Sequence, residues 1–166
     1  MRFVLGNRLL DRAGGTEVHV LTVGEQLQRL GHEVVLFAPV LGAFSAAAER
    51  RGLTVAGRLD DLPDACDVVF AQDTIVSHDL AARYPEALQV FRICGDVYDF
   101  QLPPQVPGLV DLVVVLSDRY ERLAHGCAVR PPVLRLHTPI DVDRLVPSGP
   151  LAERPRRAVL LGNYPE

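Results

Sequence analysis

Short apolar runs rich in β-branched residues alternate along this chain with longer segments of helical periodicity. The apolar runs show no polar alternation, which is typical of strands buried on both faces of a parallel sheet. Parallel strands need crossover connections, and the intervening helical segments supply them. The pattern therefore predicts an α/β protein with a Rossmann-like parallel β-sheet and helices on both faces.

The predicted elements follow one another in a regular order. We expect strands over residues 2–5, 33–38, 53–56, 67–71, 88–93, 112–116 and 133–136, and helices over 17–30, 46–51, 76–84 and 118–125. Gly31 and Gly52 are placed to end the first two helices as left-handed caps. Asp118 and Glu121 are spaced as a capping pair for the fourth helix. A loop rich in Pro and Asp occupies residues 94–108.

The carboxyl-terminal part of the chain differs in composition, because prolines become frequent there. We expect one domain over residues 1–146, followed over 147–166 by a proline-rich linker and the start of a second domain. The run at 158–162 predicts a strand. One strand cannot form a sheet by itself, so this strand would be the first of a second domain. The alternative is an extra edge strand on the first sheet. The gene would discriminate, because codons continuing past Glu166 into another βα array would support a second domain and an in-frame stop would contradict it.

Composition favours some classes of protein over others. The chain has 166 residues, of which 48% are hydrophobic and 23% charged, as in a globular domain that buries its own core. A net charge of -4 gives no electrostatic reason to expect nucleic acid as a partner. Neither a signal peptide nor a transmembrane segment is predicted. Three widely spaced cysteines, Cys66, Cys94 and Cys127, predict no metal site or disulfide framework and fit a cytoplasmic protein.

A diglycine at positions 14 and 15 stands between the first predicted strand and the first predicted helix. Glycine allows a positive φ and a close approach of the backbone to a ligand. The free amides of the first helical turn then form an anion site, which we expect at Gly14, Gly15 and Thr16. The alternative is a flexible turn with Thr16 as the N-cap. The chain lacks the G-x-G-x-x-G pattern of dinucleotide-binding proteins and has no lysine for a P-loop. Both absences argue against an NAD- or ATP-dependent function.

Five segments, taken in order, carry a family resemblance. They are the diglycine loop, the LQRLGHEV segment at 27–34, DLVVVLS at 111–117, TPIDVDRLVP at 138–147 and RAVLLG at 157–162. Together they resemble the amino-terminal domain of retaining glycosyltransferases of the GT-B fold, the glycosyl transferases group 1 type. The last of them resembles the strand that opens the second domain of that family.

The resemblance implies an enzyme that moves a sugar from a nucleotide-diphosphate sugar to an acceptor hydroxyl, with no metal or other cofactor. Gly14, Gly15 and Thr16 would bind the donor phosphates, whose developing charge needs stabilising. The acceptor, which is a sugar, a lipid or a small molecule, would bind to this half. The nucleotide would bind mostly to the second domain. This half alone is expected to be catalytically silent and to bind the donor weakly or not at all.

The sequence also departs from the family. Cys94 stands where the family has a histidine, and it is followed by Gly95 and Asp96. The turn at 71–73 also lacks a histidine. The catalytic residue is therefore unassigned, with Asp96 a candidate. A divergent or inactive member, a GT-B-fold sugar-nucleotide epimerase and a complete non-catalytic doubly wound binding module stay open as alternatives.

Four residues are candidates for acceptor binding: His19, Asp96, Asp99 and Ser117. His19 follows the diglycine by one helical turn, and the others come after carboxyl ends of strands, where open α/β sheets bind ligands. Each has a simpler interpretation. His19 would be a solvated first-turn residue, the two aspartates turn formers, and Ser117 a helix cap. Cys94 would be a buried apolar thiol unless a neighbour lowers its pKa.

Overall fold

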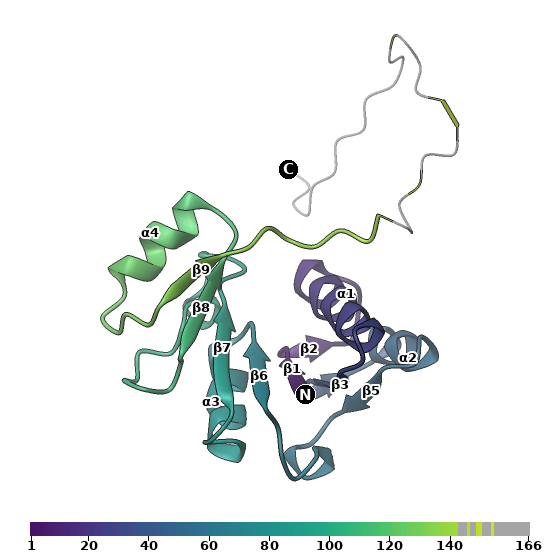
Figure 1. Ribbon diagram of the computed structural model, residues 1–166, viewed down its shortest axis with the longest axis horizontal. Coiled ribbons are helices and arrows are strands. Elements are labelled where there is room, and N and C mark those ends of the chain that lie inside the picture. Colours follow the sequence, from purple (N-terminus) through teal and green to yellow (C-terminus); the bar gives the residue numbers. More distant parts are fainter. Residues whose placement is uncertain (143–145, 147–148, 151–153, 155–166) are drawn as a thin grey trace.

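The computed structural model describes residues 1–142, 146, 149–150 and 154. Within them, one parallel sheet has the strand order β5-β3-β1-β6-β7-β8-β9 (Figure 1). Its strands are β1 (Arg2–Gly6), β3 (Glu33–Phe37), β5 (Thr54–Ala56), β6 (Val68–Ala71), β7 (Leu88–Arg92), β8 (Leu112–Val115) and β9 (Val133–Arg135). The structure confirms the predicted fold class. The predicted strand at 158–162 and the linker that precedes it lie outside the described residues, apart from isolated positions.

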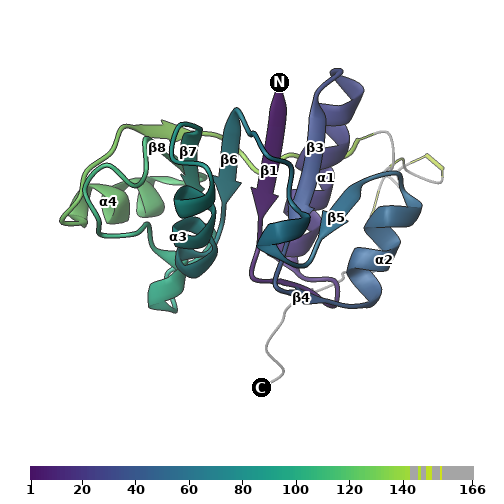
Figure 2. The same ribbon diagram turned by 90° about the horizontal axis from the view of Figure 1, so that it is seen from below.

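Helices cover both faces of the sheet. They are α1 (Gly15–Arg29), α2 (Ala43–Arg50), α3 (Thr74–Arg83) and α4 (Asp118–Gly126). Leu5 packs in a core cluster with residues of α1 and α2, whereas its neighbour Val4 packs with residues of α3. Successive strand residues point to opposite faces, so α1 and α2 cover one face and α3 the other. Figure 2 shows α3 and α4 beside β6–β8, and α1 and α2 beside β3 and β5.

Four short elements of the described structure were not predicted: two strands and two 3-10 turns. Strands β2 (Leu9–Leu10) and β4 (Val40–Leu41) pair in a separate small parallel sheet. Short 3-10 turns occupy η1 (Leu59–Asp61) and η2 (Asp99–Gln101). Such short segments carry too few residues to show a periodicity.

The predicted capping pair of α4 is wrong. Ser117 is the N-cap residue, and its hydroxyl oxygen accepts a hydrogen bond from the Tyr120 amide at 3.4 Å. Asp118 and Glu121 both form ion pairs with Arg135 of β9 instead. The prediction that Gly31 and Gly52 follow α1 and α2 as left-handed caps is confirmed. Both glycines have a positive φ, at 84° and 87°.

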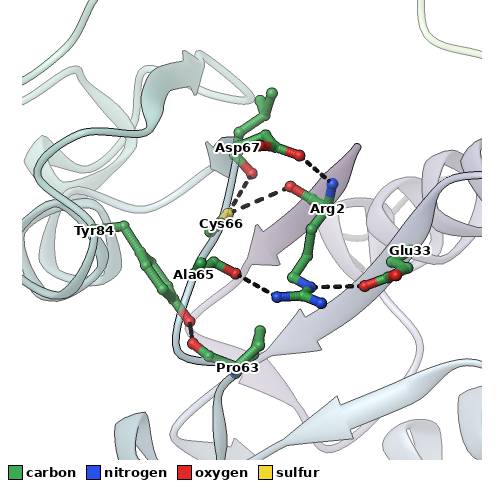
Figure 3. A network of polar contacts seen from close by, with 8 residues as sticks. Arg2, Glu33, Pro63, Ala65, Cys66, Asp67 and Tyr84 are labelled. Atoms are coloured by element: carbon green, nitrogen blue, oxygen red, sulfur yellow. Dashed lines mark hydrogen bonds and ion pairs between the residues drawn. The ribbon is translucent and has the colours of Figure 1, made fainter.

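Polar contacts tie together the amino ends of three segments (Figure 3). The Arg2 amide donates to Asp67 at 2.6 Å, and its guanidinium donates to Glu33 at 2.7 Å and to the Ala65 carbonyl at 3.1 Å. The Cys66 thiol donates to the Val68 carbonyl at 3.0 Å, and burial raises the pKa of that thiol. These contacts join β1 and β3 to the segment that precedes β6.

The carboxyl end of β1 fits closely against α3. A Cβ added at Gly6 would lie 2.6 Å from Val76 Cγ1 and 2.7 Å from Leu80 Cδ1. Both are fully buried residues of α3, so glycine is needed there for the helix to pack against the strand. No helix among the described residues has the length and apolarity to cross a bilayer.

Candidate functional site

The sheet reverses its direction of growth between β1 and β6. From β1 the chain continues to β3 on one side, and from β6 it continues to β7 on the other. A crevice forms outside the carboxyl ends of the strands at such a switch point, and ligands bind there in open α/β sheets. Asn7 follows β1, and Gln72 and Asp73 follow β6; all three side chains are buried.

Helix α1 begins at this switch point without a side-chain cap. Its N-cap residue is Gly14, and the Val18 amide bonds to the Gly14 carbonyl at 3.0 Å. Thr16 lies inside the helix, so the alternative that it is the N-cap is wrong. By contrast, Asp73 caps α3 by accepting from two backbone amides. No described residue accepts from the Gly15 or Thr16 amide, which leaves these donors for a ligand or for water.

The two glycines are needed for reasons other than a positive φ. Gly14 has φ -146° and ψ 178°, which is ordinary extended backbone, so that part of the prediction is wrong. A Cβ at Gly14 would lie 2.3 Å from Glu17 Oε2, whereas a Cβ at Gly15 would meet nothing within 4 Å. Gly14 therefore leaves space for the Glu17 carboxylate, and Gly15 presents bare backbone to an open space.

This open space is a pocket of about 440 Å³, which we call the α1 pocket. It is lined by Ala13, Gly14, Gly15, Val18, His19, Thr22, Thr138 and Pro139. The last two residues belong to the segment that leaves β9 and runs across to α1 (Figure 1). None of the lining residues carries a carboxylate, and the nearby Glu17 carboxylate, which lies against Gly14, accepts a hydrogen bond from Asn7 Nδ2 at 3.1 Å.

His19 is a buried residue of this pocket. Only 6% of it is exposed, and its ring stacks on Phe70 with centroids 5.9 Å apart. The interpretation of His19 as a solvated first-turn residue is therefore wrong. Burial, aided by the positive charge of Arg92, lowers the pKa of His19 to about 3. The imidazole is neutral near pH 7, and its Nδ1 has no hydrogen-bond partner in the part of the chain that the structure describes.

Arg92 is a buried cation that was not among the predicted site residues. It is 6% exposed, and its Nη1 donates to Gln72 Oε1 at 2.7 Å while its Nη2 donates to Thr138 Oγ1 at 3.2 Å. No carboxylate among the described residues forms an ion pair with it. Gln72 in turn donates to the Thr16 carbonyl at 3.1 Å, which connects Arg92 to α1. A charged residue at the end of a predicted buried strand, LQVFR, was the available signal.

A smaller pocket of about 90 Å³ lies next to Gln72. It is lined by Asn7, Arg8, Leu9, Thr16, Glu17, Gln72, Asp73, Cys94, Phe100 and Gln101. The Cys94 thiol faces the Gln72 carbonyl at 3.5 Å, and burial raises the pKa of Cys94 despite the opposing charge of Arg92. A protonated thiol is a poor nucleophile, so the interpretation of Cys94 as an inert buried residue is favoured.

The other candidate residues lie apart from the α1 pocket. Asp96 accepts from Arg119 Nε at 2.8 Å. Asp99 lies in η2 and lines a separate pocket of about 570 Å³ with residues of α4. Ser117 caps α4. The structure therefore brings Gly14, Gly15 and His19 together, places Thr16 and Cys94 just behind them, and separates the rest.

The described residues contain no group of three or more His, Cys, Asp or Glu placed to hold a metal ion. No family model, no curated protein and no solved structure matches the chain. The fold and the α1 pocket are therefore the observations from which a function can be inferred.

Proposed function

We propose that the protein is the acceptor-side half of a retaining GT-B-type glycosyltransferase, which moves a sugar from a nucleotide-diphosphate sugar to an acceptor hydroxyl. The five sequence segments support this proposal because they occur in the order of that family. The parallel Rossmann-like sheet supports it because the first half of a GT-B protein has such a sheet. We expect no metal or other cofactor, a second domain as partner, and a cytoplasmic location.

The observation that carries the proposal is the uncapped amino end of α1, which opens onto the α1 pocket at the switch point. The helix dipole places about half a positive charge at such an end. The Gly15 and Thr16 amides are available there to a donor diphosphate. That diphosphate is the leaving group, so donors aimed at it stabilise the charge that develops in the transition state.

The acceptor side of the proposal involves His19. Its neutral imidazole lines the α1 pocket, where it would contact an acceptor hydroxyl, and its buried Nδ1 has no hydrogen-bond partner among the described residues. Asp96, Asp99 and Ser117 stay predictions as acceptor-binding residues. Their present contacts are with Arg119, with the 570 Å³ pocket and with the Tyr120 amide. We assign no catalytic residue to this half.

The α1 pocket is a shallow concavity on this half of the proposed enzyme. Closure of a second domain over it would exclude water and align donor with acceptor. Residues 1–166 alone would then bind donor weakly and transfer nothing.

The test measures release of free nucleotide from a panel of uridine and guanosine diphosphate sugars. It compares residues 1–166 with a polypeptide that continues past residue 166 in the gene. We expect turnover only by the longer polypeptide, with the sugar found on an acceptor. An epimerised sugar nucleotide as product would support the epimerase instead. A longer polypeptide that leaves every donor and acceptor unchanged would contradict the proposal.

A further inference from the structure

Thr138 has a hydroxyl proton that no described residue accepts. Thr138 lines the α1 pocket, and its Oγ1 accepts a hydrogen bond from Arg92 Nη2 at 3.2 Å. A hydroxyl that accepts from a guanidinium keeps its own proton for another acceptor. The guanidinium also polarises the hydroxyl, because hydrogen bonds in a chain strengthen one another. Thr138 is therefore a strengthened donor at the edge of this pocket.

Arg92 brings a buried charge to the same place. Only 6% of Arg92 is exposed. Its hydrogen-bond partners among the described residues are the neutral side chains of Gln72 and Thr138. A charge taken out of water is costly unless an opposite charge compensates it. The Cys94 thiol next to Arg92 does not compensate this charge, because burial raises the pKa of that thiol and keeps it protonated near pH 7. An anion entering the α1 pocket would supply the missing compensation.

His19 is a second sign of a ligand that does not depend on the helix end. Its Nδ1 is buried and no described residue hydrogen-bonds to it, and the residue lines the α1 pocket. Buried polar atoms are nearly always satisfied in folded proteins, so an unsatisfied one at a pocket is typical of a binding site.

We infer that Thr138 and Arg92 form a relay that binds a phosphoryl group in the α1 pocket. The Thr138 hydroxyl donates to a phosphoryl oxygen, Arg92 orients and polarises that hydroxyl and supplies the counter-charge, and the Gly15 and Thr16 amides bind the same group. Thr138 is a binding residue, and Arg92 is a positioning residue. This inference rests on the proposed function for the place of the anion, and it adds the residues that recognise it.

The test titrates residues 1–166 with inorganic phosphate and follows the Gly15 and Thr16 amides by NMR. Thr138→Val removes the hydroxyl at an exposed position, so folding should be unaffected, and Thr138→Ser keeps it. We expect phosphate affinity to fall about tenfold in Thr138→Val, as for loss of a hydrogen bond to a charged group, and to change little in Thr138→Ser. Arg92→Lys keeps the charge but loses the two-point geometry, and it should also weaken binding.

Two controls separate the possible sources of the phosphoryl group. Uridine diphosphate and a hexose phosphate are titrated beside phosphate, with uridine and the free hexose as their uncharged counterparts. Tighter binding of uridine diphosphate would identify a donor group, and tighter binding of the hexose phosphate a phosphorylated acceptor. Either result supports the relay if Thr138→Val lowers the affinity for the compound that binds more tightly.

The failures are distinguishable. If phosphate shifts the Gly15 and Thr16 amides equally in the native chain and in Thr138→Val, the relay is overturned while the anion site of the proposed function stands. If no phosphorylated compound shifts these amides in the native chain, both the relay and that anion site are overturned.

Discussion

Several buried polar side chains gather at the switch point, outside the carboxyl ends of β1, β6 and β7. Gln72 is 2% exposed, and it connects Arg92 of β7 to the first turn of α1. Each such group costs free energy to bury and is kept where hydrogen bonds or a ligand compensate it. Perturbed titratable groups beside a crevice are typical of functional sites. At the scale of single residues, this cluster is the strongest reason to place function at the switch point.

His19 should make the fold sensitive to mild acid. Its pKa is lowered to about 3 in the folded chain, whereas an unfolded histidine titrates near its ordinary value of 6.5. Below pH 6.5 the histidine binds a proton in the unfolded state but not in the folded state. The free energy of unfolding is therefore unaffected by this group above that pH. It falls as the pH drops toward 3, by up to about 1.4 kcal/mol per pH unit.

Urea unfolding between pH 7 and pH 4.5 measures this effect. His19→Phe keeps a ring against Phe70 and removes the titrating group. The free energy of unfolding of this variant should therefore lack the decrease of up to about 1.4 kcal/mol per pH unit that is expected of the native chain. His78 is exposed on α3, and His78→Gln should leave the slope unchanged. Equal slopes in the native chain and in His19→Phe would show that His19 is not buried in its neutral form.

The two glycines of the diglycine should respond differently to alanine. Gly14→Ala places a methyl group against the Glu17 carboxylate and should break its 3.1 Å contact with Asn7, costing about 1 kcal/mol. Gly15→Ala meets no neighbour and should leave stability nearly unchanged, but its methyl group should reduce anion binding. Thermal unfolding and phosphate titration of both variants check this. Unimpaired phosphate binding by Gly15→Ala would contradict the approach of an anion to this residue.

At the scale of elements, the contact of β1 with α3 holds the switch point together. Gly6→Ala would force a methyl group into Val76 and Leu80, and overpacking of this kind costs about 1–3 kcal/mol. Gly126→Ala is a matched control, because a Cβ there meets nothing within 4 Å. Chemical denaturation of the two variants compares them. A Gly6→Ala variant as stable as Gly126→Ala would mean that α3 does not pack this closely on β1.

The elements were largely predictable from the sequence because apolar runs and helical periodicity are local signals. The strand LVVV at 112–115 and the ending of α1 at Gly31 are examples. Two-residue strands such as β2 and β4 were not predictable, because they depend on contacts between segments 31 residues apart, as in the pair Leu9 and Val40. The choice of Ser117 over Asp118 as cap depends on where β8 ends, which periodicity fixes only within a few residues.

The candidate site was predictable only in part. The diglycine and His19 lie one turn apart in a helix that the sequence already indicated, so their meeting in one pocket needs no tertiary information. Arg92 and Thr138 are 46 residues apart, and only the return of the chain after β9 toward α1 brings them together. No local pattern in the sequence contains that contact.

At the scale of the whole molecule, the described residues form one doubly wound unit with its crevice at a single edge of the sheet. We expect this unit to bind donors weakly, because the proposed second domain would supply most nucleotide contacts. Calorimetry of residues 1–166 with uridine and guanosine diphosphate sugars should show no tight binding. Tight binding of either donor would contradict the division of the enzyme into an acceptor half and a nucleotide half.

The most direct test of the central claim maps a nucleoside diphosphate onto the chain by NMR, at concentrations high enough to saturate a weak site. The largest shifts should fall on the Gly15 and Thr16 amides and on the His19 ring, with smaller shifts at Thr138. Shifts centred on the 570 Å³ pocket beside α4, or none at all, would contradict an anion site at the amino end of α1 and with it the proposed sugar transfer.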